Sequence, residues 1–246
     1  MIRIENISKR FKKHYALREI SAEFRSNEVI ALIGPNGSGK TTLIKCILGM
    51  VFPDEGQIFF RDKPIAGSVM HRAEIGYMPQ IGRYPDNMSI RQLTKMMINI
   101  RRADRNNIDT ELFNAFNLGE IEDKTMRSLS GGTRQKVSAC LAFMFNPVVL
   151  VLDEPTAGLD PISSEILKKK ILQEKAKGKT IIITSHILNE LDDLATHVMY
   201  LQEGTIRLFS TLEDVVSITG EQRLNKAIAM LMQHNFYNGN LHAKKV

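Results

Sequence analysis

The chain has 246 residues, a formal net charge of +6 and a hydrophobic fraction of 43%. This length fits one domain with a subdomain, and the composition is that of an ordinary globular protein. The longest apolar runs, such as 139–145, are far shorter than the ~20 residues that cross a bilayer, so we expect a soluble protein whose membrane role requires a partner chain. The basic clusters are short and lack interleaved aromatics, and we therefore expect no nucleic-acid partner.

Taken in chain order, the apolar patterns predict an α/β fold. Because strands and helices alternate, we expect a mainly parallel sheet covered by helices on both faces. We expect a main domain over 1–216 with a helical insertion at about 81–140, then a helix and a partly disordered tail in 217–246. Asp62-Lys63-Pro64 is predicted to form a turn. The predicted strands are 2–7, 20–24, 29–33, 57–60, 75–78, 148–152, 180–184 and 197–201, and the predicted helices are 89–100, 109–118, 133–146, 162–176 and 221–233.

The stretch 34–42 matches the phosphate-binding P-loop pattern, and it lies between an apolar strand and a helix, as that motif requires. Its backbone N–H groups are expected to face a phosphate chain, with the positive end of the following helix behind them. Lys40 should reach the β- and γ-phosphates, and the Thr41 hydroxyl should bind Mg²⁺. The nucleotide-binding residues predicted here are Gly34, Asn36, Gly37, Ser38, Gly39, Lys40, Thr41 and Thr42.

Two adjacent carboxylates, Asp153 and Glu154, end a buried apolar strand. Ligands in an open α/β sheet lie at the carboxyl ends of the parallel strands. Asp153 therefore suits the Mg²⁺ shell, and Glu154 is placed to orient and deprotonate the water that attacks the nucleotide. Without the P-loop, the same pattern would equally fit a strand that enters a polar turn.

A second candidate anion site is the turn Ser130-Gly131-Gly132, which precedes a predicted helix. Small residues with free N–H groups at a helix N-terminus attract anions. Two phosphate-binding features about 90 residues apart in one chain suggest that two chains share each nucleotide. The alternative is a glycine turn in which Ser130 only caps the helix.

These motifs, with Gln80, Leu159-Asp160 and His186, resemble the ABC ATPase family over about residues 1–215. The resemblance implies a P-loop NTPase core with an N-terminal antiparallel β subdomain and an inserted α-helical subdomain. It implies ATP and Mg²⁺ as cofactors and a second ATPase subunit, for which we expect a homodimer. It also implies an integral membrane transporter chain as partner, and a cytoplasmic position on the inner face of the cell membrane.

The resemblance assigns roles to further residues. Gln80 would contact Mg²⁺ and the attacking water, Asp160 would act across the dimer interface, and His186 would hydrogen-bond the γ-phosphate. Tyr15 would stack on adenine, with Phe11 as a rival. Ordinary structural roles stay open for these residues, as a loop residue, a cap or part of the core.

The turn Ser130-Gly131-Gly132 and the following Thr133 resemble the signature motif of the family, and we call this segment the signature turn. It departs from the family at one position. Thr133 stands where the familiar form has Gln, and Gln135 lies two residues further on. The Ser130-Gly131-Gly132 core is intact, so we expect hydrolysis to survive.

A narrower resemblance concerns the runs 130–138, 143–147 and 153–161, which are similar to the ATPase subunit of the transporter for copper-site maturation of nitrous-oxide reductase. Relatives in drug, sodium and cytochrome-assembly export share much of this sequence. The alternative function is a soluble ABC ATPase of iron–sulfur cluster assembly. A GTPase is disfavoured, because Asn225-Lys226 continues as Ala227-Ile228 and not as a guanine-reading motif.

We expect the membrane chain to dock beside the Gln80 loop. Recognition of a short helix uses apolar anchors in a groove. Tyr84 is predicted to be exposed there, next to Met96 and Met97.

Overall fold

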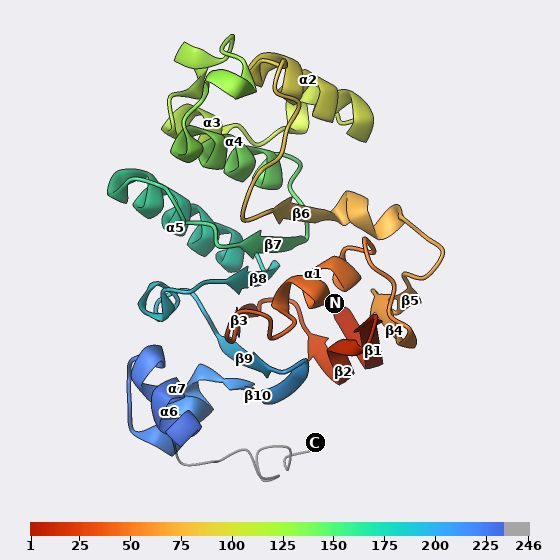
Figure 1. The fold of residues 1–246 in the computed structure, drawn as a ribbon. Coiled ribbons are helices and arrows are strands. Elements are labelled where there is room, and N and C mark those ends of the chain that lie inside the picture. The colour runs from red at the N-terminus through yellow and green to blue at the C-terminus, as the bar shows by residue number, and fades with distance from the viewer. Residues whose placement is uncertain (234–246) are drawn as a thin grey trace.

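The computed structural model describes residues 1–233, except the side chains of Arg105, Met232 and Gln233. The molecule contains two sheets and a group of helices at one end (Figure 1). The first sheet is antiparallel, in the order β2-β1-β4-β5. Its strands are β1 (Ile2–Phe11), β2 (His14–Phe24), β4 (Glu55–Phe60) and β5 (Lys63–Pro64). This confirms the predicted N-terminal antiparallel subdomain.

The second sheet has six strands in the order β10-β9-β3-β8-β7-β6. All neighbours in it are parallel except β10, which pairs antiparallel with β9 at one edge. Every residue of the central strands β3, β7 and β8 is buried, as expected for parallel strands covered on both faces. The strands are β3 (Val29–Ile33), β6 (Ile75–Met78), β7 (Val149–Asp153), β8 (Thr180–Thr184), β9 (His197–Gln202) and β10 (Thr205–Thr211).

The helical insertion lies beyond the β6 edge of this sheet (Figure 1). It contains α2 (Ile90–Arg101), α3 (Glu111–Ala115) and α4 (Gly131–Phe143), of which α4 packs on β6. Ser89 caps α2 as predicted, in a capping box with Gln92. The remaining helices are α1 (Lys40–Ile47), α5 (Pro161–Ala176), α6 (Leu212–Thr219) and α7 (Leu224–Gln233), and the short 3₁₀ turns are η1 (Met70–Glu74), η2 (Arg105–Asn107), η3 (Leu118–Ile121), η4 (Met126–Ser128) and η5 (Leu188–Glu190).

Several predicted boundaries are wrong for local reasons. The helix expected over 109–118 is only α3, because Asn117 adopts a left-handed conformation with φ 51°. The turn expected at 62–64 lies one residue earlier, so that Lys63–Pro64 pairs with β4. Strand β10 was not predicted at all. The disorder predicted for the tail, from 234 on, lies outside the described residues.

The six-stranded sheet separates two apolar cores. On one face, Val29, Ala31 and Ile33 join the cluster that includes α4, α5 and α7. On the other, Ile30 and Leu32 join the cluster formed with α1 and the antiparallel sheet. A strand alternates its side chains between faces, so the five residues of β3 are divided between the two cores. This fixes the loop after β3 firmly at one edge of the sheet.

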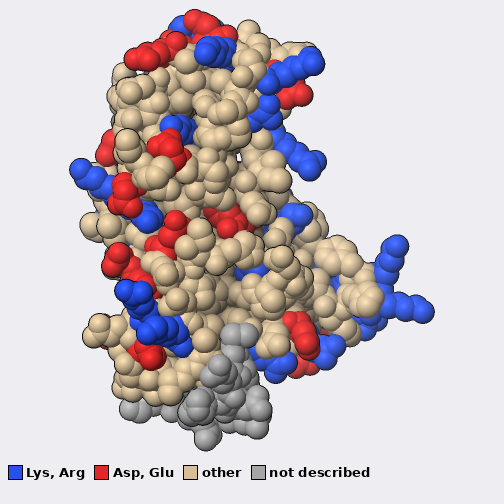
Figure 2. Space-filling model, turned by 60° about the vertical axis from the view of Figure 1, so that its left-hand side comes forward, with Lys and Arg blue, Asp and Glu red and all other residues tan. Residues whose placement is uncertain are grey.

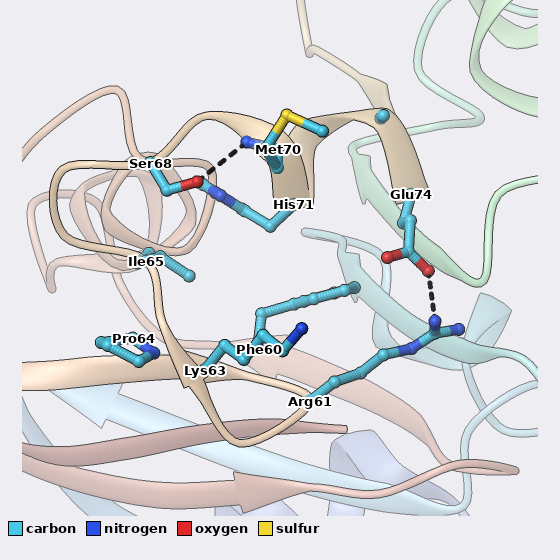
Figure 3. A pocket seen from close by; sticks show the side chains of 10 residues that line it. Phe60, Arg61, Lys63, Pro64, Ile65, Ser68, Met70, His71 and Glu74 are labelled. Atoms are coloured by element: carbon cyan, nitrogen blue, oxygen red, sulfur yellow. Dashed lines mark hydrogen bonds and ion pairs between the residues drawn. The ribbon is translucent and has the colours of Figure 1, made fainter.

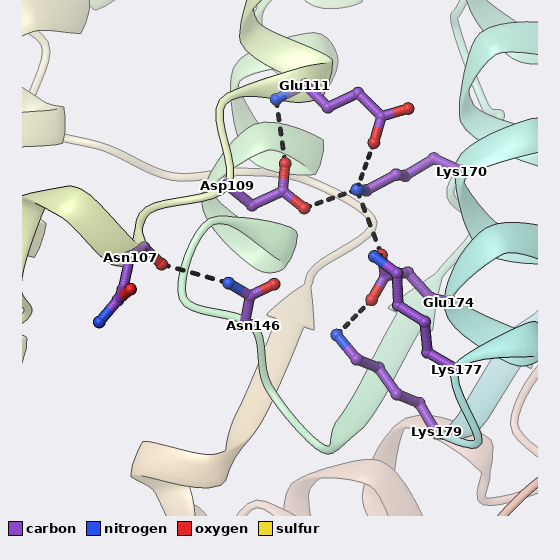
Figure 4. A network of polar contacts seen from close by, with 8 residues as sticks. All are labelled: Asn107, Asp109, Glu111, Asn146, Lys170, Glu174, Lys177 and Lys179. Atoms are coloured by element: carbon purple, nitrogen blue, oxygen red, sulfur yellow. Dashed lines mark hydrogen bonds and ion pairs between the residues drawn. The ribbon is translucent and has the colours of Figure 1, made fainter.

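A buried ion network connects the helical insertion to the core (Figure 4). Lys170 of α5 has 1% of its side chain exposed. Its Nζ lies 2.5 Å from Asp109, which precedes α3, and 2.7 Å from Glu111, the first residue of α3. It also lies 3.2 Å from Glu174, which contacts Lys177 and Lys179. The network therefore holds α3 against α5 through paired charges.

Basic and acidic side chains are interspersed over the face shown in Figure 2. Within residues 1–233, no helix combines the length and the apolar character needed to cross a bilayer.

Candidate functional site

The P-loop forms the connection between β3 and α1, and its backbone is held closely by neighbouring strands. A Cβ atom at Gly34 would lie 2.1 Å from the carbonyl oxygen of Leu201. Gly39, with φ 109°, stands before the first turn of α1, and a Cβ there would lie 2.5 Å from the carbonyl oxygen of Ala16. Side chains cannot be accommodated at either position, so both glycines are required by close approach as well as by conformation.

A cavity of about 380 Å³ lies over this loop. It brings together P-loop residues with the loop glutamine, the two carboxylates and the histidine that the sequence singled out. The lining residues are Ala16, Asn36, Gly37, Ser38, Gly39, Lys40, Thr41, Thr42, Gln80, Asp153, Glu154 and His186. Six predicted residues do not line it: Tyr15, Gly34, Ser130, Gly131, Gly132 and Asp160.

The order of strands explains why these distant segments meet. Strand β8 lies between β3 and β7, and β6 follows β7, all of them parallel. The carboxyl ends of the four strands therefore lie at one edge of the sheet. In register, Thr184 of β8 lies beside Asp153 of β7, and His186 follows two residues later.

Glu154 is held through both its side chain and its backbone. Its Oε1 lies 3.0 Å from Nε2 of His186. Its N–H donates to Oγ1 of Thr184 at 3.0 Å, and its carbonyl oxygen accepts a hydrogen bond from Nε2 of Gln135 at 3.3 Å. The residue adopts φ 54°, which is uncommon for a residue with a side chain. Thr184 also donates to the neighbouring Asp153 carboxylate, so one hydroxyl orders both acidic residues.

Lys40 folds back onto the P-loop. Its Nζ donates to the carbonyl oxygens of Gly34 at 2.6 Å and Pro35 at 3.1 Å. Burial lowers the pKa of Lys40, and the negative charges of Glu154 and Asp153 oppose that shift. The ammonium group therefore has loop carbonyls as partners that a phosphate oxygen can replace.

The donor set at the cavity fits Mg²⁺ held jointly by protein and phosphate. Thr41, Gln80 and Asp153 line the same cavity and carry a hydroxyl, an amide and a carboxylate group. Among residues 1–233, no cluster of three or more His, Cys, Asp or Glu residues could hold a metal by itself. Mg²⁺ is usually bound by one or two carboxylates together with substrate phosphates, and these three oxygen donors match that mode.

The signature turn is built as a helix cap. Ser130 is the N-cap of α4, and its Oγ accepts from the N–H of Thr133 at 3.2 Å. The hydroxyls of Ser130 and Thr133 lie 2.9 Å apart, so Thr133 supports the serine directly. A Cβ at Gly132 would lie 2.7 Å from the carbonyl oxygen of Gly158, whereas one at Gly131 would meet nothing within 4 Å. The capping role is thus present, and Gly131 faces open space.

Asp160 and Tyr15 have partners outside the cavity. Asp160 caps α5 and its carboxylate lies 2.8 Å from Nζ of Lys136. Tyr15 is 39% exposed, so it is not a core residue, and the guanidinium groups of Arg10 and Arg18 lie 4.3 Å and 4.8 Å from its ring centroid. Phe11 is also exposed.

Tyr84 is not freely exposed as predicted. Its ring is half-buried against the core, and its hydroxyl donates to Oγ of Ser138 at 3.0 Å. From the sequence, Tyr84 lies in a loop. The sequence does not show that Ser138 of α4 lies within hydrogen-bond distance of it. Tyr84 nevertheless lines a groove of about 280 Å³ with Met97 and Leu141.

A larger cavity, of about 450 Å³, lies between the β4–β5 hairpin and η1 (Figure 3). Arg61 and Glu74 form an ion pair of 2.7 Å across its edge. None of the predicted site residues lines this cavity. Size alone therefore does not identify the site, whereas the convergence of a P-loop with two carboxylates does.

Comparison with known proteins agrees with this geometry. The ABC transporter family profile matches residues 17–157. The chain is 34% identical over 220 residues to the lipopolysaccharide export system ATP-binding protein LptB of Haemophilus influenzae. The aligned region covers 87% of this chain and 91% of LptB. The chain belongs to the family of ABC transporter ATP-binding proteins.

Other members of the family have other cargoes. The ABC ATPase described here is 32% identical over 208 residues to the lantibiotic transport ATP-binding protein SrtF of Streptococcus pyogenes, with 85% of this chain and 90% of SrtF covered. The solved ATP-binding subunit of an ABC transporter superposes with a TM-score of 0.88 at 25% identity, over 94% of this chain and 99% of that one. The dimeric ABC transporter cassette MJ0796 shares the fold, with a TM-score of 0.74 at 22% identity over 86% of this chain and 98% of that one. The chain is therefore an ATP-hydrolysing ABC ATPase.

Three residues at the site of this ABC ATPase were not predicted: Ala16, Thr184 and Gln135. Ala16 adjoins the predicted Tyr15, and Thr184 directly precedes Ser185-His186, so position in the chain could have indicated both. Gln135 was noted only as a neighbour of Thr133. Its contact with the backbone of Glu154 depends on how α4 lies against the loop after β7, which the sequence does not reveal.

Proposed function

We propose that two copies of this ABC ATPase close around two ATP–Mg²⁺, each held between the P-loop of one copy and the Ser130-Gly131-Gly132 turn of the other. The observation that carries the proposal is the separation of these two features within one chain. The described lining of the P-loop cavity includes Lys40 and Thr41 but no residue of the turn 130–132. Gly131 faces open space, where a phosphate held by a second copy can approach its N–H.

Six of the residues that line the cavity have a proposed part in hydrolysis. Lys40 exchanges its loop carbonyls for phosphate oxygens, which become its charged partners. Thr41, Gln80 and Asp153 would hold Mg²⁺, which when bound withdraws charge from the phosphate oxygens.

Glu154 then takes a proton from the attacking water. As that proton leaves, the water oxygen bonds to the γ-phosphorus and the bond to the bridging oxygen breaks, which gives ADP and phosphate. His186, at 3.0 Å from Glu154, orients the carboxylate and is placed to donate to the γ-phosphate.

The test replaces Glu154 with Gln, which keeps the size and removes the proton acceptor. Hydrolysis should fall by about 100-fold or more. ATP should still bind, and an ATP-bound dimer should persist in gel filtration with Mg²⁺-ATP. Glu165→Gln makes the same change on the exposed face of α5 and should leave the rate unchanged. Wild-type hydrolysis by Glu154→Gln would show that another group is the base, and a monomer with ATP would argue against a shared site.

We further propose that the groove lined by Tyr84, Met97 and Leu141 receives a short helix of an integral membrane transporter chain. The groove lies beside the Gln80 loop and also includes Met50, which is 56% exposed. Ile81, next to Gln80, is 69% exposed. Helices that bind in grooves use apolar anchors of this kind. The ATPase would then lie in the cytoplasm, peripheral on the inner face of the cell membrane.

For the cargo, we propose export or metallo-enzyme maturation, specifically of the copper site of nitrous-oxide reductase. The proposal is supported by the amino-acid sequence of the runs 130–138, 143–147 and 153–161, which resembles the ATPase subunit of the transporter for that copper site. The test is to purify the tagged chain from detergent-solubilised membranes and identify the transmembrane protein that accompanies it. A soluble iron–sulfur assembly protein in its place would favour the alternative function.

A further inference from the structure

The loop that carries Glu154 is joined to the signature helix α4 within one chain. Nε2 of Gln135, in the second turn of α4, donates to the carbonyl oxygen of Glu154 at 3.3 Å. Lys136, the next residue, pairs with Asp160 at 2.8 Å. Gly132 approaches Gly158 so closely that a Cβ would lie 2.7 Å from its carbonyl oxygen. Three residues in the first two turns of α4 therefore contact the segment 154–160.

Among these contacts, the one from Gln135 bears on the backbone of Glu154 itself. Gln135 is 6% exposed and Glu154 is 9% exposed, so water does not compete freely for this hydrogen bond. The Glu154 carbonyl also accepts from the N–H of Ala157 at 3.1 Å. Its N–H is held by Thr184. The peptide groups on both sides of Glu154 are thus fixed by hydrogen bonds from different elements.

Such fixation is needed because Glu154 has a positive φ of 54°. A residue with a side chain keeps this conformation only when its surroundings determine it, and such strain is common at catalytic positions. The direction of the carboxylate follows from the backbone angles. Without the bond from Gln135, the carbonyl would still accept from the N–H of Ala157, but the peptide would be less firmly held. The carboxylate could then move away from the water that it must deprotonate.

We infer that Gln135 is a positioning residue for hydrolysis, which acts through the backbone of Glu154 and aligns its carboxylate when α4 is seated against the core. The inference rests on the proposed role of Glu154 as the base. It also gives the same helix two tasks. The start of α4 presents Ser130 and Gly131 to the nucleotide of a second copy, and its second turn holds the base of its own copy.

The test compares Gln135→Met and Gln135→Glu with the wild type. Met keeps the length of the side chain and removes the N–H donor. Glu keeps the shape of Gln and places an oxygen against the carbonyl of Glu154. It is the second variant, on which the test rests if Met disturbs the packing of α4. We expect kcat to fall by about 10-fold for Met and further for Glu, since small displacements of a catalytic group have large effects on rate. KM and binding of a fluorescent ATP analogue should change little in both variants. The thermal midpoint should change little for Met and should fall for Glu, because Glu buries a carboxylate beside a carbonyl oxygen.

The matched control is Gln92→Met, which makes the same change at a hydrogen bond that only caps α2. It should leave kcat at the wild-type value. The decisive comparison repeats Gln135→Met in the Glu154→Gln background. If Gln135 acts through Glu154, it should alter the residual rate there by less than about 2-fold, because linked residues are not additive.

The outcomes separate the two proposals. An unchanged kcat in Gln135→Met, or an equal fall in both backgrounds, would overturn the positioning role. A fall in kcat that is matched by losses of ATP affinity and thermal midpoint would also overturn it and indicate a structural role. If Glu154→Gln itself hydrolyses ATP at the wild-type rate, the failure lies with the proposed base.

Discussion

Replacing Lys170 with Met should destabilise the protein more than any change at its exposed partners. Lys170 has 1% of its side chain exposed and contacts three carboxylates, at 2.5, 2.7 and 3.2 Å. Met has a similar length and suits a buried position. The substitution therefore removes the charge and leaves the packing nearly unchanged.

The expected loss follows from which carboxylates are left unpaired. Removing one partner from a buried ion pair costs about 3–5 kcal/mol. Glu174 keeps Lys177 at 2.7 Å and Lys179, whereas the Asp109 carboxylate, 12% exposed, keeps the N–H of Glu111 and no other partner among the described residues. We therefore expect about 3 kcal/mol, at the lower end of that range. Glu111→Gln, at a side chain 51% exposed, should cost less than about 1 kcal/mol.

The measurement is the free energy of unfolding from urea titrations of both variants at neutral pH. No residue of the network lines the P-loop cavity, so binding of a fluorescent ATP analogue should stay within about 2-fold of wild type in the folded variants. A loss for Lys170→Met no larger than that for Glu111→Gln would refute the reasoning. A more stable Lys170→Met would show that burying the ammonium costs more than its three partners return.

Three further results are expected. Gly131→Asp, at a position with free space, should leave ATP binding by a single copy intact and abolish ATP-dependent dimerisation in gel filtration, because the new carboxylate repels the γ-phosphate. Gly131→Ala is the control, and normal dimerisation of the Asp variant would exclude a phosphate at this position. Met97→Glu should abolish co-purification with the membrane chain and spare the ATPase rate of the isolated subunit, so retained co-purification would remove Met97 from the interface. Burial opposes ionisation of Glu174, but its lysine partners outweigh burial and lower its pKa to about 2 from 4.5. Its stabilisation is thus complete above pH about 4.5 and lost as pH falls toward 2, which urea titrations across this range will detect; a flat profile in the range would contradict it.

The sequence predicted the parallel core well because its strands are buried on both faces. The runs 29–33 and 148–152 are apolar throughout, and 180–184 has three isoleucines between two threonines, so these segments are readily predicted as buried strands. The residues that follow these strands are then expected to lie close together, because parallel neighbours end at the same edge of the sheet. For this reason Lys40 and Asp153 could be placed at one cavity from the sequence, whereas the place of His186 was implied by the resemblance to the ABC ATPase family.

Contacts that depend on tertiary packing could not be predicted in this way. The helix expected over 109–118 ends early because of the conformation of Asn117, which periodicity does not register. Tyr84 was expected in solvent because its partner, Ser138, lies 54 residues away on another element. Strand β10 follows the tight turn at Glu203-Gly204, and its mixture of polar and half-buried residues gives only a weak pattern.

The turn at Gly131 lies outside the P-loop cavity, and the proposed division of the nucleotide site between the two has a consequence for kinetics. If each site is completed by a second copy, the rate of hydrolysis by the free subunit should rise with the square of its concentration while monomers predominate. Two subunits bound to one membrane assembly would instead meet at an effective concentration of the order of millimolar, as for modules joined by short linkers. ATP consumption would then be confined to subunits that occupy a transporter, and unassembled copies would remain nearly idle.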